Sequence, residues 1–366
     1  GLNLHFIYYL KQKLYILFMK IKLILFTAFS ILIFSNFTAQ EKERKFKIHT
    51  IAFYNLENLF DTINDVNKND EASPMMEIKF NRSAIYKQKV SNMARVISEI
   101  GYDITKRPPT IVGICEVENR TVVEDLISDE KLSTHNYGIV HYDSPDRRGI
   151  DVGLLYNKDI FKLINSNSHV LYINYNNTSE RSYTRDQLVV SGKLDGELIH
   201  LIVNHWPSRG ADETKRMAAA EVNNTIIDSL RKIYSNPKII TMGDFNDDPF
   251  DKSIKKILGA KKKIEDVGKN DLFNPFEEIL VEKGIGTNAY RDKWQLFDQI
   301  ILSKPFLKKD YKDYQLYKAG VFNKSYLINK KGKFKGYPFR SFSYGTFTGG
   351  YSDHLPPYIY LLKEIK

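Results

Sequence analysis

Acidic, amide and imidazole side chains follow several short apolar runs of this 366-residue chain. The clearest case is the run 239–243, which is followed at once by Asp244, Phe245 and Asn246. Rigid strand ends that carry variable loops are where α/β proteins place reactive groups. Taken alone, the stretch is equally compatible with an Asp/Asn-rich turn after an edge strand. Its recurrence elsewhere in the chain indicates a site for phosphate and metal chemistry.

The other polar groups at predicted strand ends belong to the same chemical types. They are Asn55, Glu57, Glu116, His205, Asp298, Asp353 and His354. Carboxylate and amide oxygens without a zinc-type Cys or His cluster favour Mg²⁺, with Mn²⁺ or Ca²⁺ as alternatives. Histidines with acids beside them supply proton transfer near neutral pH. Individually, each of these residues also fits a turn or a packed ring.

Three further residues have both a functional and a structural interpretation. Arg185 and Arg209 could clamp a phosphate or be solvated surface charges. Asp151 stands at the start of a predicted strand, where it could orient His205 or complete a turn. The chain's one cysteine, Cys115, lies in an apolar run, which favours a small buried core residue over a nucleophile.

The pattern of apolar residues predicts alternating strands and helices. Strands are expected at 48–54, 110–115, 137–141, 151–156, 188–194, 197–204, 239–243, 295–302 and 355–362, and helices at 83–100 and 213–234. The dipeptide Asp195–Gly196 between two alternating runs predicts a hairpin. Hairpins mixed with crossover helices, without a repeat or an interdomain linker, indicate two packed sheets with helices outside.

Residues 1–40 resemble a targeting segment preceded by an upstream stretch. Lys20 and Lys22 give a basic start, residues 23–34 are apolar, and Ala39 is a candidate cleavage point. A membrane anchor is the alternative, although the apolar run is short for a span. We therefore expect export to the extracellular space or periplasm, no membrane span in the mature chain, and a folded part at 41–366.

Charge is a weak guide to the partner. The formal net charge of +10 suits a polyanionic substrate, but Lys, Asn and Ile are abundant throughout and no basic block marks a nucleic-acid arm. No protein partner is evident, and a monomer is expected.

Six short motifs together resemble those of the endonuclease/exonuclease/phosphatase superfamily, which includes DNase I-like nucleases. They lie at 53–57, 114–117, 203–207, 243–246, 297–301 and 351–354, in the family's order. The resemblance covers about 48–362. It implies a four-layer α/β/β/α sandwich of two mixed sheets and a metal-dependent phosphoric ester hydrolase.

The resemblance also implies roles for individual residues. Metal binding would fall to Glu116, with Glu57 and Asp353 as partners, and Asn55 would orient Glu116 or the phosphate. His205 would donate to the phosphate or protonate the leaving oxygen, Asp244 and Asn246 would position the attacking water, and the Asp298–His354 pair would act as a base or stabilise the phosphoryl charge. Asp298 would fix the tautomer of His354, and the resemblance leaves open whether Asp244 or His354 is the general base.

Residues 303–346 form a Lys-, Tyr- and Phe-rich segment, which we interpret as an insertion at the rim of the site. Such side chains could stack on bases or grip a lipid head group. The favoured function is an exported phosphodiesterase, specifically an extracellular endonuclease acting on DNA or RNA, because 204–208 resembles secreted nucleases. The alternatives are a phospholipid or sugar-phosphate phosphoesterase and a non-catalytic binding module.

Overall fold

The structure is a computed structural model that describes residues 4–35, 44–174 and 178–365. It divides into two compact units, Gly1–Lys45 and Phe46–Lys366. In the first unit the predicted targeting segment contributes helix α1 (Leu4–Ser35). The candidate cleavage point Ala39 lies outside the described residues, so export stays a prediction. Among the described helices, none combines the length and apolar content required to cross a membrane.

The second unit contains two large mixed β-sheets among its described residues. The six-stranded sheet has the order β16 (Gln315–Val321), β19 (Pro357–Ile365), β1 (Lys45–Leu59), β2 (Ile111–Val117), β4 (Asp151–Asn157), β3 (Tyr137–His141). The seven-stranded sheet has the order β11 (Ala260–Lys261), β12 (Leu272–Phe273), β15 (Asp298–Ser303), β10 (Ile239–Asp244), β9 (Glu197–His205), β8 (Gln187–Leu194), β5 (Phe161–His169).

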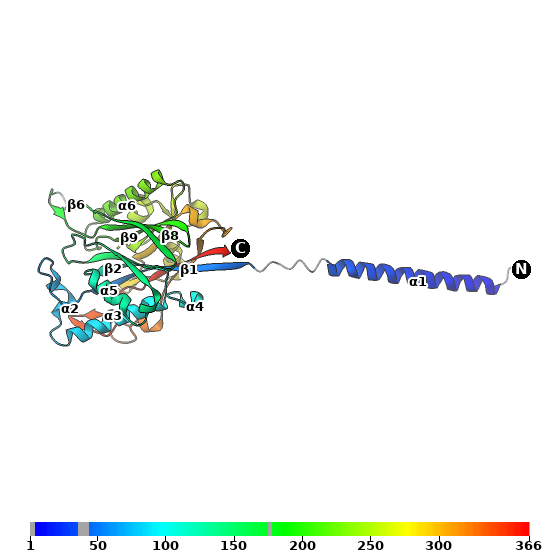
Figure 1. The fold of residues 1–366 in the computed structure, drawn as a ribbon, viewed down its shortest axis with the longest axis horizontal. Helices are drawn as coiled ribbons and strands as arrows, with labels where there is room; N and C mark the ends of the chain where they lie inside the picture. Colours follow the sequence, from blue (N-terminus) through cyan, green and yellow to red (C-terminus); the bar gives the residue numbers. More distant parts are fainter. Residues whose placement is uncertain (1–3, 36–43, 175–177, 366) are drawn as a thin grey trace. The chain divides into compact units, whose positions relative to one another are not determined.

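Apolar side chains from both sheets form the central core, and helices cover the outer faces. Phe53 and Leu154 of one sheet share a buried cluster with Leu201, Met242 and Ile300 of the other. Helices α3 (Arg82–Glu99) and α5 (Arg120–Ser128) pack on the first sheet, and α6 (Glu213–Ile233) packs on the second (Figure 1). These layers confirm the predicted α/β/β/α sandwich.

Smaller elements complete the second unit. Helices α2 (Pro74–Glu77), α4 (Tyr102–Thr105) and α7 (Phe276–Lys283) are short, and three two-stranded pairs are β6 (Ile173–Asn174) with β7 (Arg181–Ser182), β13 (Asn288–Tyr290) with β14 (Lys293–Gln295), and β17 (Phe342–Ser343) with β18 (Thr346–Phe347). Single turns of other helix types occur at Asp70–Ala72, Ser133–His135, Ser253–Ile257, Ile264–Asp266, Lys304–Leu307 and Ser325–Leu327.

The structure changes the interpretation of one predicted segment. Residues 303–346 were expected to be an insertion, but Gln315–Val321 is edge strand β16 and pairs with β19. The strand was missed because its lysine and tyrosine side chains break the alternation of apolar and polar residues. The part of this segment after β16 borders the site, as described below.

Gly243 allows strands β9 and β10 to approach each other next to the site. It pairs with Asn204, and a Cβ atom at Gly243 would lie 2.3 Å from the Asn204 carbonyl oxygen. Because backbone cannot move aside as a flexible side chain does, a larger residue must push the two strands apart.

We predict that Gly243→Ala lowers the free energy of unfolding by about 1–3 kcal/mol, because overpacking costs that much. Urea unfolding followed by circular dichroism would measure the loss. Gly210→Ala is the matched control, since its nearest atom would be Ser208 Oγ at 3.5 Å. An equal unfolding midpoint for Gly243→Ala and the wild type would contradict the packing argument.

Candidate active site

Three polar residues lie in one row across neighbouring strands of the seven-stranded sheet. In the parallel pair β9–β10 His205 is opposite Asp244, and in the antiparallel pair β10–β15 Asp244 is opposite Asp298. β9 and β10 end at these residues and β15 begins there. The row therefore lies at one edge of the sheet, and all three residues are buried.

The six-stranded sheet contributes two more residues through an irregular ladder. Asn55 on β1 is opposite Cys115 on β2, and the register then shifts at Glu116. Such bulges re-aim a side chain. Asn55 Nδ2 donates to Asp244 Oδ2 at 3.1 Å and to Glu116 Oε1 at 3.4 Å. This amide therefore joins the two sheets at the site.

Backbone strain is concentrated at the same place. Glu57, Asn58, Glu116 and Asn246 have φ angles of 47°, 51°, 60° and 51°. Asparagine tolerates the left-handed region, but for glutamate it costs roughly 1–2 kcal/mol. Residues held in such conformations cluster at functional sites, where surrounding contacts maintain them. Here the backbone N–H of Asn58 donates to Glu116 Oε2 at 2.9 Å, which links two of the strained residues.

Asp244 is the centre of the arrangement. Its Oδ1 accepts the backbone N–H of Asn246 at 3.0 Å, and this hydrogen bond joins Asn246 to the row of His205, Asp244 and Asp298. Its Oδ2 lies 3.8 Å from His205 Nε2 and 3.9 Å from His354 Nε2. Glu116 Oε1 is also 3.8 Å from His205 Nε2. Two carboxylates and two imidazoles thus face one small space.

His354 reaches this space from the loop before β19. Its Nδ1–H donates to Asp298 Oδ2 at 2.6 Å, which is the hydrogen bond expected to fix its tautomer. The loop is tied to β1, because Ser352 Oγ donates to the Asn55 carbonyl at 2.7 Å. His354 Nε2 is consequently presented towards Asp244 rather than towards Asp298.

Burial and neighbouring charges shift the pKa values of these groups in different directions. Burial would lower the pKa of His354, but the carboxylates of Asp298 and Asp244 outweigh it and hold that pKa well above its usual range. Burial raises the pKa of Asp244 to about 7; the His354 charge opposes this rise and the Asp298 carboxylate adds to it. Burial, then Arg185, lowers the pKa of His205 well below its usual range.

The two arginines predicted to clamp phosphate are both engaged with the protein. Arg185 is buried and donates to the Trp206 carbonyl at 2.5 Å and to Asp146 at 3.1 Å. Arg209 pairs with Asp248 at 3.0 Å and with Asp251, and its guanidinium lies 4.5 Å from the Phe297 ring centre. Arg185 acts on the site through its charge beside His205, and Arg209 lies at the edge of the adjoining groove.

The prediction that Asp151 orients His205 is wrong. Asp151 Oδ1 accepts the N–H and the hydroxyl of Ser144 at 2.7 Å each, and its Oδ2 lies 3.1 Å from His141 Nε2. Both carboxylate oxygens are therefore used within the β3–β4 connection. His205 Nδ1 is buried and has no hydrogen-bond partner among the described residues.

Glu57 was predicted to share a metal ion with Glu116, but it occupies a separate ion-pair network. Its carboxylate accepts the Ser341 N–H at 2.6 Å and the Arg340 Nε–H at 3.2 Å. Arg340 also donates to Asp353 at 2.9 Å, so Asp353 belongs to the same network. Burial raises the pKa of Glu57 to about 7, the Asp353 charge adds to this, and buried Lys89 opposes it. In this network Arg340 supplies the positive charge beside Glu57 and Asp353.

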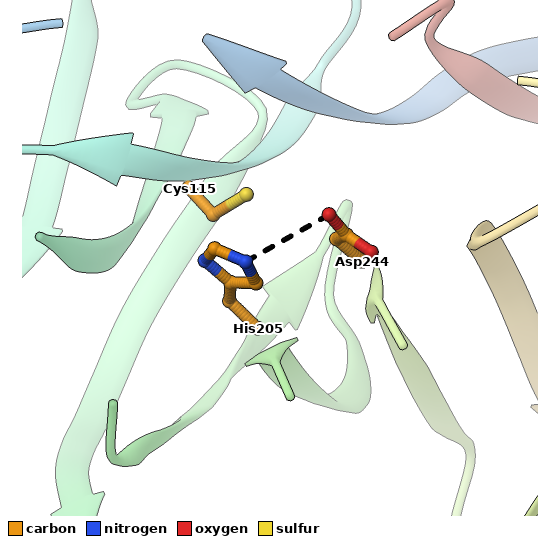
Figure 2. A group of neighbouring side chains, drawn as sticks. All are labelled: Cys115, His205 and Asp244. Carbon is orange, nitrogen blue, oxygen red and sulfur yellow. Dashed lines mark ion pairs between the residues drawn. The ribbon is translucent and has the colours of Figure 1, made fainter. Parts of the chain in front are cut away.

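The remaining donors fit a hard divalent cation. Among the described residues, three groups have ligand atoms within 4.8 Å of one another. Two are at this site, Cys115 with His205 and Asp244, and Asp244 with Asp298 and His354; the third, His141 with Asp143 and Asp151, belongs to the β3–β4 connection. Figure 2 shows Cys115 beside the His205–Asp244 pair. Burial raises the pKa of the Cys115 thiol well above its usual range, which disfavours a thiolate. The carboxylates of Glu116 and Asp244, both bonded to Asn55, are the hard ligands of Mg²⁺-type ions.

A groove of about 990 Å³ opens at Asp353 and His354. It runs between the β13–β14 hairpin and residues 329–340, and Arg340 lines it beside the ion-pair network. The expectation that the 303–346 segment borders the site therefore holds for its later part. The sequence did not identify Arg340, Tyr290 or Arg291, because none of them lies in a motif. The turn at Arg291 also has no Gly or Asn to indicate a hairpin.

These groups on a sandwich of two mixed sheets define a phosphoester hydrolase of the DNase I-like class. Residues 50–363 match the Endonuclease/Exonuclease/phosphatase family, and the chain belongs to this family, whose members are metal-dependent phosphoester hydrolases. No curated protein matches the chain in sequence.

Solved structures share the fold at low sequence identity. An endonuclease/exonuclease/phosphatase family protein from Bacteroides thetaiotaomicron is 14% identical with a TM-score of 0.53, and covers 88% of this chain and 100% of its own. A mannosyl-6-phosphatase from Bacteroides thetaiotaomicron VPI-5482 is 15% identical with a TM-score of 0.51, covering 86% and 99%. D. rerio TDP2 complexed with single-strand DNA product is 14% identical with a TM-score of 0.51, covering 86% and 99%.

We predict that Asp298→Asn lowers kcat on an aryl phosphodiester by about a hundredfold or more, because His354 loses the acceptor that holds its proton and orientation. NMR titration of the metal-free protein should show a lower pKa for His354. The control is Asp228→Asn on the surface of α6, where the side chain is 63% exposed. A wild-type rate in Asp298→Asn would contradict the positioning role.

Proposed function

We propose that this protein is an exported, Mg²⁺-dependent phosphodiesterase that cleaves nucleic acid internally, as an endonuclease. One observation carries the proposal: Asp244 Oδ2 is surrounded by Asn55, His205 and His354 at 3.1, 3.8 and 3.9 Å, beside Glu116, at the mouth of a groove. This arrangement has ligands for a cation, groups that move protons and room for an extended substrate.

Glu116 and Asp244 would hold the cation. A bound Mg²⁺ supplies charge stabilisation at the non-bridging phosphate oxygens. His354, oriented by Asp298, presents Nε2 to the reacting phosphate and donates a proton or hydrogen bond there. Neutral His205 donates one N–H to the same group, and Asn246 keeps Asp244 in place through its backbone N–H. Asp244 then accepts the proton of the attacking water.

Nucleic acid is the favoured substrate because the groove beside the site carries basic and aromatic side chains. Arg209, Arg291, Lys333 and Arg340 line it, together with Tyr290 and Phe334. A polyanion with stackable rings complements such a surface. The structurally similar TDP2 of D. rerio, which has been solved with single-strand DNA product, is consistent with this substrate class.

Export is part of the proposal and is supported by the sequence. Residues 19–34 combine a basic start with an apolar run of signal-peptide length. Expression of the full chain in a bacterial host would test it, with N-terminal sequencing of the protein recovered from medium or periplasm. A protein that keeps residues 19–34 and stays with the cells would contradict export.

We predict that the full chain nicks plasmid DNA or cleaves RNA in Mg²⁺, and that EDTA abolishes the reaction. Glu116→Gln and His354→Ala should each lower the rate by at least about a hundredfold while keeping the wild-type circular dichroism spectrum, since each removes a group that acts on the transition state. The control is Glu124→Gln on α5, where the side chain is 52% exposed.

Two other substrates test the alternatives in the same assay. Release of phosphate from mannose 6-phosphate, or of head groups from sphingomyelin vesicles, without cleavage of nucleic acid would replace the nuclease proposal with a sugar-phosphate or phospholipid esterase. Hydrolysis that survives EDTA would contradict the metal dependence.

A further inference from the structure

We propose that the groove beside His354 binds one unstacked nucleobase and its adjoining phosphate, so that the enzyme selects single-stranded over duplex nucleic acid. This inference rests on the proposed function and deepens it. Four observations carry it: a strained turn, two ties that hold the groove walls, the exposed Tyr290 ring with the half-buried Phe334 ring, and two cations without acidic partners.

The first wall is the β13–β14 hairpin, whose turn has an unusual composition. Tyr290 pairs with Lys293, so Arg291 and Asp292 form a two-residue turn with φ angles of 47° and 61°. Turns of this kind strongly prefer Asn or Gly, because both positions need a left-handed backbone. The strain places the Arg291 guanidinium 5.2 Å from the centre of the Tyr290 ring, at the groove. Strained residues of this type indicate a functional constraint.

The second wall, residues 329–340, is held through its C-terminal part, both to the first wall and to the ion-pair network of Glu57 and Asp353. The Tyr337 hydroxyl donates to Asp292 Oδ1 at 2.7 Å and accepts the Asp292 N–H at 2.6 Å. Three residues further along, Arg340 bonds Glu57 and Asp353. The groove is therefore preorganised, which lowers the entropic cost of binding.

The lining combines ring faces with available positive charge. Tyr290 is 59% exposed, and Lys333 Nζ lies 5.7 Å from the Phe334 ring centre. Within the described residues, neither Arg291 nor Lys333 lies within ion-pair distance of a carboxylate, whereas Arg209 and Arg340 both do. Arg291 and Lys333 are therefore the charges free to meet an added phosphate.

These features fit a ligand in which a flat ring is followed along the chain by an anionic group. A single strand presents both, since each unpaired base has a free π-face and the next phosphate follows it. In a duplex the base faces are stacked on neighbours and cannot reach a protein ring without unstacking. A lipid head group has the anion and no flat ring. The groove lies next to His354, so a strand bound in it continues into the catalytic space.

Binding of a fluorescent single-stranded 12-mer to the full chain in EDTA measures the groove without turnover. We expect wild-type protein to bind the single strand at least about tenfold more tightly than the matching duplex, and Tyr290→Ala and Phe334→Ala to weaken binding about tenfold to a hundredfold each, as for other stacked bases. Lys333→Glu should weaken binding and reduce its salt dependence.

Matched controls are Tyr102→Ala, whose ring is 48% exposed on α4, and Lys309→Glu, an exposed lysine away from the groove. Equal affinity for single strand and duplex, or wild-type affinity in both aromatic variants, would overturn this inference. So would displacement of the 12-mer by mannose 6-phosphate and not by AMP. Thermal unfolding midpoints identify any aromatic variant that fails to fold. In that case the affinity of the surface variant Lys333→Glu for the 12-mer tests the inference.

The hydrolysis assay separates this inference from the proposed function. If plasmid DNA is cleaved and the groove variants bind the single strand as tightly as the wild type does, the nuclease proposal is kept and the proposed role of the groove is rejected. If an aryl phosphodiester is hydrolysed and no nucleic acid is cleaved, the nuclease proposal is rejected instead.

Discussion

The register of three strands is the constraint on which the site depends. Parallel β9 and β10 pair His205 with Asp244, and antiparallel β15 pairs Asp298 with the same Asp244. A slip of one residue in either ladder would send a side chain to the opposite face of the sheet. Apolar neighbours oppose that slip, because Ile202 before His205, Met242 before Asp244 and Ile300 after Asp298 are fully buried. Packing of the core therefore sets the geometry of the catalytic groups.

Repulsion between carboxylates opposes this arrangement. Glu116, Asp244 and Asp298 bring three carboxylates to one edge, and burial raises the pKa of Asp244 to about 7. Charged His354 offsets part of the repulsion through Asp298, and Arg340 does the same for Glu57 and Asp353. A divalent cation between Glu116 and Asp244 would complete the balance. The fold therefore holds these carboxylates close together, and nearby positive charges stabilise them. Such preorganisation is expected of a site that acts on phosphate.

The parts of the site that the sequence predicted are those decided by local pattern. His205 and Asp244 directly follow apolar runs, so periodicity placed them at strand ends and their convergence followed from the sandwich. Asp298 lay inside the predicted strand 295–302, whereas the structure begins β15 at this residue. Asp151 and Glu57 also occupy strand ends, but their partners come from elsewhere: Ser144 in a connection, and Arg340 from 283 residues along the chain. Periodicity carries no information about such partners. Strand β16 was also missed, because its polar residues at the sheet edge remove the alternation of apolar and polar side chains.

The catalytic residues and the residues that line the groove stand on different kinds of element. His205, Asp244 and Asp298 stand on buried strands and His354 stands on the loop before β19, whereas Tyr290 and Arg291 belong to the β13–β14 hairpin and Phe334 to a connecting segment. Loops can change without disturbing the register of the sheet. We propose that the walls beside His354 select the phosphoester that enters, while the groups of the two sheets and His354 act on its phosphate.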